Sequence, residues 1–325
     1  MVDVARMTSY LRRRFGEDAA VHDLEYIHGG YSKYTILVSA TFEGSRQEVV
    51  FRQVPKGRHE EDLPFEFDVL RHVWAPDRPT PEPLWIEPSR NDLGGPFLVT
   101  RRAAGSNLGD VFEAKTSVPE QFSLDLADFL AQLHRLDPAS VEKAPVEPMR
   151  TPEEIRQAID AMAAKAEEAT GIGPRLAAVL GWLRAHIPQA GGPPSLLHGD
   201  VGLHNALTEN GRLTAMLDWE RSHFGDPAED LAYLRPSLEP VYPWQAFVDR
   251  YVEAGGKAPD PAAERFYTVW QDTWRHIACL THGENFFDTR VVPQMIAGLV
   301  QSRRFLASAV DSAFGNVTHH AADRS

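Results

Sequence analysis

The sequence predicts an α+β protein in which a small antiparallel-sheet part precedes a larger helical part. Segments rich in β-branched and aromatic residues lie in the first third of the chain, whereas later segments repeat apolar residues at helical spacing. Because strands and helices are segregated along the chain, a doubly wound parallel sheet is not expected. The 325 residues are enough for two parts with sizeable cores.

The sheet part is predicted over residues 23–102, after an N-terminal helical extension at 1–22 with Thr8 or Ser9 as its N-cap. Two β-rich segments flank a short polar turn, which predicts an antiparallel hairpin. The expected elements are hairpin strands at 34–42 and 47–54, a helix at 64–73, and strands at 84–87 and 96–103.

The helical part is predicted over residues 103–325. Ser117 is a candidate N-cap for a helix whose apolar residues run from Phe122 to Leu133. Thr151 begins a T-P-E-E sequence, which combines an N-cap, a proline in the first turn and a capping-box glutamate. Gly171 is a candidate end for that helix, and two or three further helices are expected between residues 243 and 314.

Charge and composition exclude several classes of partner. The formal net charge is −13, which argues against nucleic acid or an anionic membrane as the main partner. A single cysteine, Cys279, allows no internal disulfide, and its apolar surroundings predict an inert thiol. The chain opens without a secretory signal and has no apolar run long enough to span a bilayer, so we expect a cytoplasmic protein. Oligomeric state is left open.

Three polar residues gather beside apolar segments in "LLHGDVGLHNALTENGRLTAMLDWE": Asp200, Asn205 and Asp218. Short strands flanking a loop can bring such residues to one rim, and carboxylate and amide oxygens suit Mg²⁺. Two other interpretations are ordinary polar loop residues, or a zinc site formed by His198, Asp200 and His204. Neither accounts for Asp218.

The pattern "HGDxxxxN … DWE … GDPxxDLA" over residues 198–232 resembles the aminoglycoside phosphotransferase and choline-kinase-like family. The resemblance extends over roughly residues 23–290. The segment "VVFRQVP" also resembles the branch related to acyl-CoA-dehydrogenase-associated kinases, which commonly has "LR" at this place. The resemblance implies a bilobal protein-kinase-like fold and Mg²⁺-dependent transfer of the γ-phosphate of ATP or GTP to a small-molecule hydroxyl.

The same resemblance assigns roles within the motif. Asp200 would be the catalytic base that accepts the proton of the attacking hydroxyl, and Asn205 and Asp218 would hold Mg²⁺ on the nucleotide phosphates. His198 and Asp230 would brace the loop rather than react.

The resemblance also predicts a nucleotide site in the sheet part. Arg52 would replace the lysine that usually pairs with the phosphates, and Glu66 would pair with Arg52. Lys33 would either contribute phosphate-binding charge or be solvated. The expected nucleotide-binding residues are Gly29, Gly30 and Ser32 in the lid, Arg52, Glu66, and Thr100, Arg101 and Arg102 beside adenine.

Acceptor identity is predicted only as a class. Asp272, Glu284 and Asp288 are interleaved with aromatic residues, which suits a mixed apolar pocket at least as well as a polycation site. An antibiotic and a metabolic hydroxy compound therefore both stay open. The alternative function is a catalytically silent nucleotide-binding pseudokinase module. A protein kinase is disfavoured because no A-P-E-like segment follows Asp218.

Overall fold

The computed structural model describes residues 2–27, 33–55, 60–109, 117–137, 139, 141, 151–188, 193–281 and 292–315. The chain groups into two compact units. The sheet unit comprises Met1–Leu108, Ala139–Val146 and Asn205–Ser222. The helical unit comprises Gly109–Pro138, Glu147–His204 and His223–Ser325.

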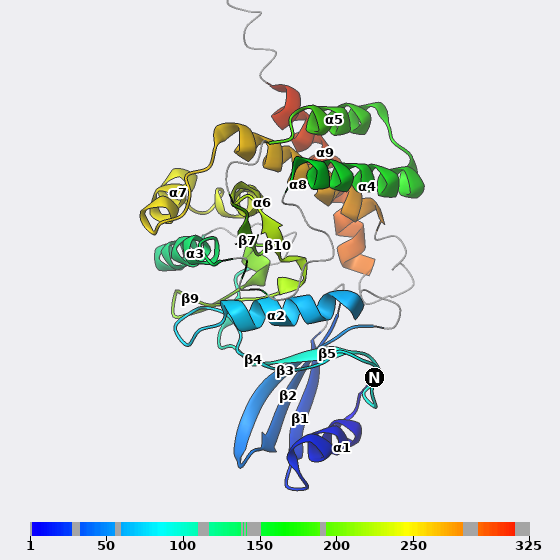
Figure 1. Cartoon of the computed structure of the whole chain (residues 1–325), viewed down its shortest axis with the longest axis vertical. Coiled ribbons are helices and arrows are strands. Elements are labelled where there is room, and N and C mark those ends of the chain that lie inside the picture. The colour runs from blue at the N-terminus through cyan, green and yellow to red at the C-terminus, as the bar shows by residue number, and fades with distance from the viewer. Residues whose placement is uncertain are drawn as a thin grey trace, which may run out of the picture. The chain divides into compact units, whose positions relative to one another are not determined.

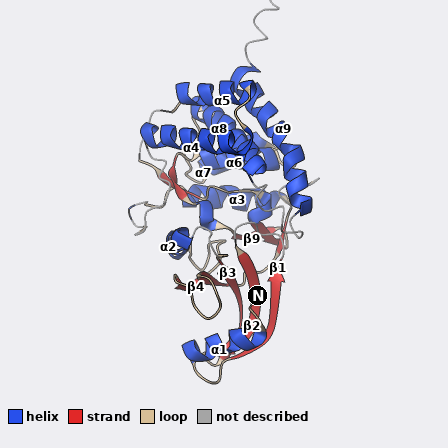
Figure 2. Ribbon diagram, turned by 90° about the vertical axis from the view of Figure 1, so that its right-hand side faces the viewer, coloured by secondary structure: helices blue, strands red, loops and turns tan. Residues whose placement is uncertain are grey.

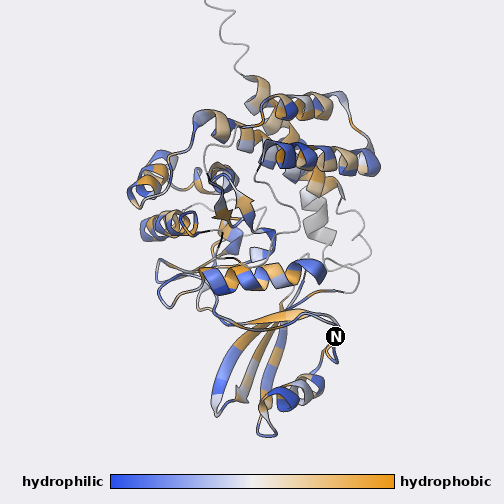
Figure 3. Cartoon of the chain, viewed as in Figure 1, coloured by the Kyte–Doolittle hydropathy of each residue, from blue (hydrophilic) through white to orange (hydrophobic). Residues whose placement is uncertain are grey.

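The sheet unit is built on a five-stranded antiparallel sheet with the strand order β1-β2-β3-β5-β4 (Figure 1). The predicted hairpin is confirmed, with Glu43 and Gly44 as a two-residue turn at positive φ between β2 and β3. Figure 3 shows hydrophobic and hydrophilic stretches along these strands. The strands are β1 (Ala20–Ile27), β2 (Tyr34–Phe42), β3 (Ser45–Gln53), β4 (Pro83–Glu87) and β5 (Phe97–Arg101).

Two helices accompany this sheet. The first, α1 (Val4–Phe15), lies beside the strands (Figure 2) and buries Met7 and Leu11 in a core shared with β3 and β4. Its N-cap is Asp3, whose carboxylate accepts the Arg6 N–H, so the predicted caps at Thr8 and Ser9 are wrong. A 3₁₀ turn, η1 (Glu60–Asp62), leads into α2 (Leu63–Val73), which agrees with the predicted helix.

A second, three-stranded sheet in this unit joins segments that are far apart in the sequence. Its order is β6 (Ser106–Asn107), β8 (Ala206–Glu209) and β9 (Arg212–Met216). The Met216 N–H donates to the Pro79 carbonyl at 2.8 Å, and the Thr214 hydroxyl donates to the Ala104 carbonyl at 2.7 Å. These bonds fix the segment that carries Asn205 and Asp218 to the sheet unit. The 3₁₀ turn η4 (Trp219–Arg221) follows.

In the helical unit, α4, α5, α6, α8 and α9 share one core, and the predicted apolar stripe from Phe122 to Leu133 is buried on α3. The capping box of α4 is confirmed, because Thr151 and Glu154 bond each other's backbone N–H. The predicted cap at Ser117 is wrong: α3 begins after Pro119. The helices are α3 (Glu120–Leu133), α4 (Pro152–Thr170), α5 (Pro174–Ala185), α6 (Ala228–Leu238), α7 (Trp244–Glu253), α8 (Pro261–Thr281) and α9 (Val292–Phe314).

A short antiparallel pair of strands, β7 (Ser195–Leu197) and β10 (His223–Gly225), completes the helical unit and leads into the loop that begins at His198. A further 3₁₀ turn, η3 (Leu203–Asn205), ends that loop. None of the helices in the described part of the chain is long and apolar enough to cross a membrane.

Candidate active site

In the helical unit, the side chain of Asp230 holds the backbone of the loop that carries Asp200. Asp230 lies in the first turn of α6 and is 0% exposed. Its Oδ2 accepts the His198 backbone N–H at 2.8 Å, and its Oδ1 accepts the Gly199 N–H at 2.8 Å. His134 Nε2 contacts the same Oδ2 at 3.0 Å, and its Nδ1 contacts the Tyr251 hydroxyl at 2.8 Å. The loop backbone is therefore held at two consecutive amides by one carboxylate.

The chemistry of this arrangement keeps Asp230 ionised. Burial alone raises the pKa of a carboxylate, because it disfavours the charged form. The hydrogen bond and charge of His134, followed by those of His198, outweigh burial and hold the pKa of Asp230 below its ordinary value. A charged, buried carboxylate accepts stronger hydrogen bonds than a neutral group, so the loop geometry is firmly set.

Asp200 lies on a backbone shaped by two glycines. Gly199 has φ of 78°, a left-handed conformation that favours glycine, and the Asp200 N–H donates to His198 Nδ1 at 3.2 Å. The ring of His204 lies against Gly202, where a Cβ would come within 2.4 Å of it. His204 Nε2 is 3.5 Å from Asp200 Oδ1. The imidazole is thus placed beside the carboxylate proposed below as the catalytic base.

The zinc interpretation has no support in the described residues. No group of three or more His, Cys, Asp or Glu side chains in that part of the chain is arranged to hold a metal ion. His198 is fully buried, and its backbone belongs to the hydrogen-bond network of Asp230.

The two predicted magnesium ligands lie together in the sheet unit. The Leu217 N–H donates to the Asn205 carbonyl at 2.7 Å, which continues the pairing of β8 with β9. Asn205 therefore lies across from the residue that precedes Asp218. Asp218 itself adopts φ 68° and ψ 68°, a left-handed conformation that is costly for a residue other than glycine and is typical of functional sites.

Oxygen donors of this kind fit Mg²⁺, which usually binds one or two carboxylates together with phosphate oxygens and waters. A Mg²⁺ site of this kind does not need protein ligands at every coordination position. The guanidinium of Arg52 lies beside this carboxylate, with Nη2 at 2.6 Å from Asp218 Oδ1.

The pairing of Glu66 differs from the prediction. Lys33 Nζ contacts Glu66 Oε2 at 2.9 Å and Glu220 Oε2 at 2.5 Å. Arg52 Nη2 instead contacts Asp218, with Glu220 Oε2 at 3.8 Å. Among the described residues Glu66 thus contacts Lys33 directly and not Arg52 as predicted, although its charge still raises the pKa of Arg52. Lys33, which precedes β2 and is 8% exposed, is the cation that reaches the helix carboxylate, so the solvated alternative for Lys33 is also wrong.

Burial by itself lowers the pKa of Lys33, but the charges of Glu66 and Glu220 outweigh it and raise the pKa above its ordinary value. The pKa of Arg52 is likewise raised, because the nearby carboxylates, Asp218 first, outweigh its burial. Both side chains are therefore cations at neutral pH.

The segment predicted to meet adenine is the end of β5. Thr100 pairs with Val50 inside the sheet. The Arg101 N–H donates to the Glu82 carbonyl at 2.8 Å, and the Arg102 N–H donates to the Glu48 carbonyl at 2.9 Å. These two amides are thus engaged within the sheet unit. The predicted lid residues Gly29, Gly30 and Ser32 lie outside the described residues.

Sequence reasoning missed three residues of these networks: His134, Tyr251 and Glu220. His134 follows the apolar stripe of α3 in "LAQLH", and a histidine at the end of such a stripe is a weak signal for a buried contact. Glu220 lies two residues after Asp218, and a second carboxylate this close to a predicted metal ligand is a signal for a shared charge network. Tyr251 has no distinguishing signal, because a tyrosine on an amphipathic helix is ordinary core.

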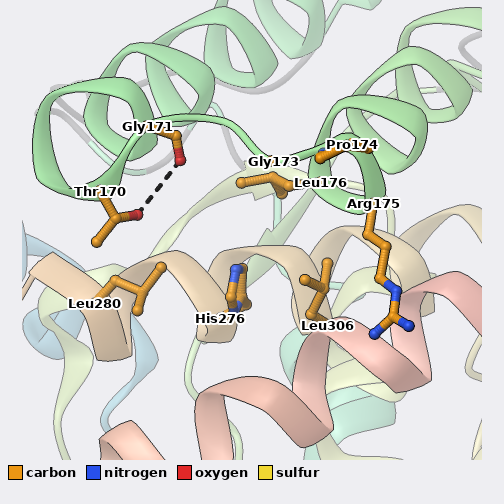
Figure 4. A pocket seen from close by; sticks show the side chains of 9 residues that line it. All are labelled: Thr170, Gly171, Gly173, Pro174, Arg175, Leu176, His276, Leu280 and Leu306. Atoms are coloured by element: carbon orange, nitrogen blue, oxygen red, sulfur yellow. Dashed lines mark hydrogen bonds between the residues drawn. The ribbon is translucent and has the colours of Figure 1, made fainter.

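A pocket of about 500 Å³ opens in the helical unit, between the α4–α5 connection, α8 and α9 (Figure 4). His276 and Leu280 on α8 and Leu306 on α9 form one wall, with Gly171 and Gly173 opposite. Burial lowers the pKa of His276, although its bond to the Ser302 carbonyl opposes this. The lining described here is mainly apolar.

Of the predicted substrate residues, Asp272 does not line this pocket. It is 4% exposed and pairs with Arg275 at 3.4 Å within α8. Burial raises the pKa of Asp272, although Arg275 opposes this. Glu284 and Asp288 lie outside the described residues.

A sequence model of the phosphotransferase enzyme family (APH) matches residues 23–267, so the chain belongs to this family. Acyl-CoA dehydrogenase family member 11 of Rattus norvegicus is 28% identical over 247 residues, which make up 71% of this chain and 31% of that protein. The chain thus spans about a third of the length of that relative. Viomycin phosphotransferase of Streptomyces vinaceus is 26% identical over 265 residues, which make up 75% of this chain and 82% of that protein.

Among solved structures, a thermostable variant of aminoglycoside phosphotransferase APH(4)-Ia, in a ternary complex with AMP-PNP and hygromycin B, matches with a TM-score of 0.63 and 21% identity. The match covers 95% of this chain and 99% of that chain. Because the sequence identity is only 21%, this match shows a shared fold and not a shared substrate. The predicted family and the predicted α+β, bilobal protein-kinase-like fold are confirmed.

Proposed function

We propose that the protein transfers the γ-phosphate of ATP or GTP to a hydroxyl group of a small molecule, with Mg²⁺ as the metal. Its membership of the phosphotransferase enzyme family supports the reaction class. The observation that carries the proposal is the buried Asp230, whose carboxylate holds the loop bearing Asp200 through two backbone amides. A loop held this firmly suits a reaction that depends mainly on positioning and charge neutralisation.

In this reaction Asp200 accepts the proton of the attacking hydroxyl while the hydroxyl oxygen forms a bond to the γ-phosphorus. The bond between the γ-phosphorus and the bridging oxygen breaks, and the nucleoside diphosphate leaves with that oxygen. Asn205 and Asp218 would hold Mg²⁺, which when bound neutralises charge on the phosphates. Asp230 and His198 keep Asp200 in place.

The nucleotide would be bound by the sheet unit. Backbone amides at Gly29 and Gly30 and the hydroxyl of Ser32 would cover the phosphates. Adenine would meet the backbone between Thr100 and Arg102. Since the amides of Arg101 and Arg102 are already bonded, their carbonyl groups and the amide that follows are the better candidates for this contact.

The acceptor is proposed only as a class, an antibiotic or a metabolic hydroxy compound. One relative is by its name a viomycin phosphotransferase, and the structure in the ternary complex holds hygromycin B. Another relative is an acyl-CoA dehydrogenase family member, which favours a metabolic acceptor equally well. Glu284 and Asp288 stay proposed acceptor contacts, and Asp272, which is buried and pairs with Arg275, stays proposed with them.

The test measures release of ADP and GDP by the purified protein with Mg²⁺ across three acceptor sets. These are aminoglycosides with peptide and macrolide antibiotics, hydroxy acids with their CoA thioesters, and choline-like amino alcohols. Asp200→Asn should abolish release with any acceptor that works while keeping nucleotide affinity. Asp249→Asn, an exposed change on α7, is the matched control and should be fully active. Nucleotide binding without Asp200-dependent turnover in every set would instead support a silent nucleotide-binding module.

A further inference from the structure

Five charged side chains in the sheet unit form one network, buried at Lys33 and Glu66 and partly exposed at the other three, that the sequence did not predict. Two cations, Lys33 and Arg52, meet three carboxylates, Glu66, Asp218 and Glu220. Each cation has its own main partner, and Glu220 is within 4 Å of both. The division of partners indicates that the two cations have different tasks.

We propose that Lys33 is the cation that pairs with the nucleotide phosphates, and that Arg52 is a positioning residue that holds Asp218 and competes with the metal for it. This inference rests on the proposed function and deepens it. It reverses the assignment made from the sequence, in which Arg52 was the phosphate-pairing residue and Glu66 its partner.

The contacts of Lys33 support its part of the proposal. Its Nζ is held from two sides, by Glu66 on α2 at 2.9 Å and by Glu220 on η4 at 2.5 Å. An ammonium group has three N–H donors, and these contacts engage two of them. Lys33 also directly follows residues 28–32, the segment proposed to cover the phosphates. A compact charge at this place, oriented by two carboxylates, is suited to a phosphate oxygen.

The contacts of Arg52 point to a different role. Its Nη2 lies 2.6 Å from Oδ1 of Asp218, the carboxylate proposed to hold the metal. Arg52, on β3, thereby holds the side chain of Asp218, whose backbone adopts the left-handed conformation. The same ion pair partly neutralises Asp218, so a metal ion that binds Asp218 must weaken or displace it. Arg52 therefore sets both the position of the carboxylate and its affinity for a cation.

The charge of the network is consistent with this competition. The three carboxylates exceed the two cations by one negative charge. Removing the positive charge of Arg52 would increase that excess beside Asp218 and strengthen its attraction for Mg²⁺. Removing the charge of Lys33 would instead take away attraction for phosphate, with or without the metal.

The experiment measures binding of AMP-PNP by titration calorimetry, first without metal and then over a series of Mg²⁺ concentrations. We expect Lys33→Met to weaken AMP-PNP binding about 10- to 100-fold in both conditions, as for loss of one charge-assisted contact. Lys33→Arg, which keeps the charge, should recover part of that loss. Lys165→Met, an exposed change on α4, is the matched control and should bind like the unmodified protein.

For Arg52→Met we expect metal-free AMP-PNP affinity to stay within about twofold, while the Mg²⁺ concentration for half-maximal binding falls several-fold. A purely structural role would not shift that Mg²⁺ concentration downwards. Melting curves of every variant show whether it is folded. If Lys33→Met proves unstable, the double variant Lys33→Met with Glu66→Leu removes both charges of one pair and should show the same loss of affinity.

Two results would overturn the inference. The first is a folded Lys33→Met variant that binds AMP-PNP as tightly as the unmodified protein. The second is an Arg52→Met variant that loses affinity for AMP-PNP in the absence of metal, which would show that Arg52 contacts the phosphates. Failure of the proposed function gives a different result. The unmodified protein would then release no ADP or GDP with any acceptor, whereas the AMP-PNP titrations would still support or overturn the roles of Lys33 and Arg52.

Discussion

The contacts of Asp230 allow the effect of Asp230→Asn to be worked out bond by bond. The carboxylate accepts three hydrogen bonds, from the His198 N–H, the Gly199 N–H and His134. An amide has one oxygen, so its best orientation keeps the two donors at Oδ2 and turns an NH₂ group toward Gly199. The variant therefore loses one bond outright and weakens two.

The magnitude follows from typical bond energies. A buried donor left unpaired costs about 1–3 kcal/mol, and exchanging two charge-assisted bonds for neutral ones costs about 1 kcal/mol each. Burial of an uncharged amide, which is easier to desolvate than a carboxylate, offsets part of this loss. We expect the free energy of unfolding of the helical unit to fall by about 2–4 kcal/mol. Transfer activity should fall as well, because the loop of Asp200 loses its anchor.

The assay is urea unfolding followed by far-ultraviolet circular dichroism, with Asp249→Asn as a surface control that should change stability by less than about 0.5 kcal/mol. The pH dependence gives an independent check. Because the pKa of Asp230 is lowered in the folded protein, its contribution is complete above the ordinary carboxyl pKa of about 3.9 and is lost as the pH falls through the folded value. The difference in free energy of unfolding between the unmodified protein and Asp230→Asn should therefore be constant from about pH 6 to 8 and shrink below about pH 4.

A variant as stable and as active as the unmodified protein would refute the reasoning. So would a stability difference that stays unchanged down to about pH 2, because the carboxylate could then not be the source of the effect.

Three further predictions concern local structure. Thr151→Ala removes the N-cap of α4 and should cost about 1 kcal/mol in urea unfolding, and a change below about 0.3 kcal/mol would contradict the capping role. Gly105→Ala should be strongly destabilising, because φ is 104° and a Cβ would lie 2.6 Å from the Thr208 carbonyl oxygen. The control Gly181→Ala, an exposed change within α5 with nothing within 4 Å, should be at least as stable in urea as the unmodified protein. Burial raises the pKa of Cys279 to about 11, so its thiol should react with iodoacetamide at pH 8 far more slowly than a free cysteine, and unfolding in urea should restore the rate.

The sequence by itself determined the local elements and the main motif. The hairpin at 34–53 could be predicted because β-branched residues flank a polar turn, and α4 because a capping box announces its start. The beginnings of α1 and α3 were misplaced, since several residues near each start are acceptable N-caps and only the folded chain selects one. The motif from His198 to Asp230 predicted the family, because its polar residues keep both their spacing and their apolar flanks.

Tertiary structure alone decided which charges meet. Lys33 precedes β2, Arg52 lies on β3 and Glu66 lies on α2. Their pairing depends on side-chain reach and on the position of α2 beside the sheet. A sequence lists the charges but not the distances of a few ångströms that select one partner over another. The bonds of Asp230 to His134 were hidden for the same reason, because 96 positions separate two residues that the fold places 3.0 Å apart. Local sequence sets secondary structure, whereas the networks that hold this site arise only when distant segments pack together.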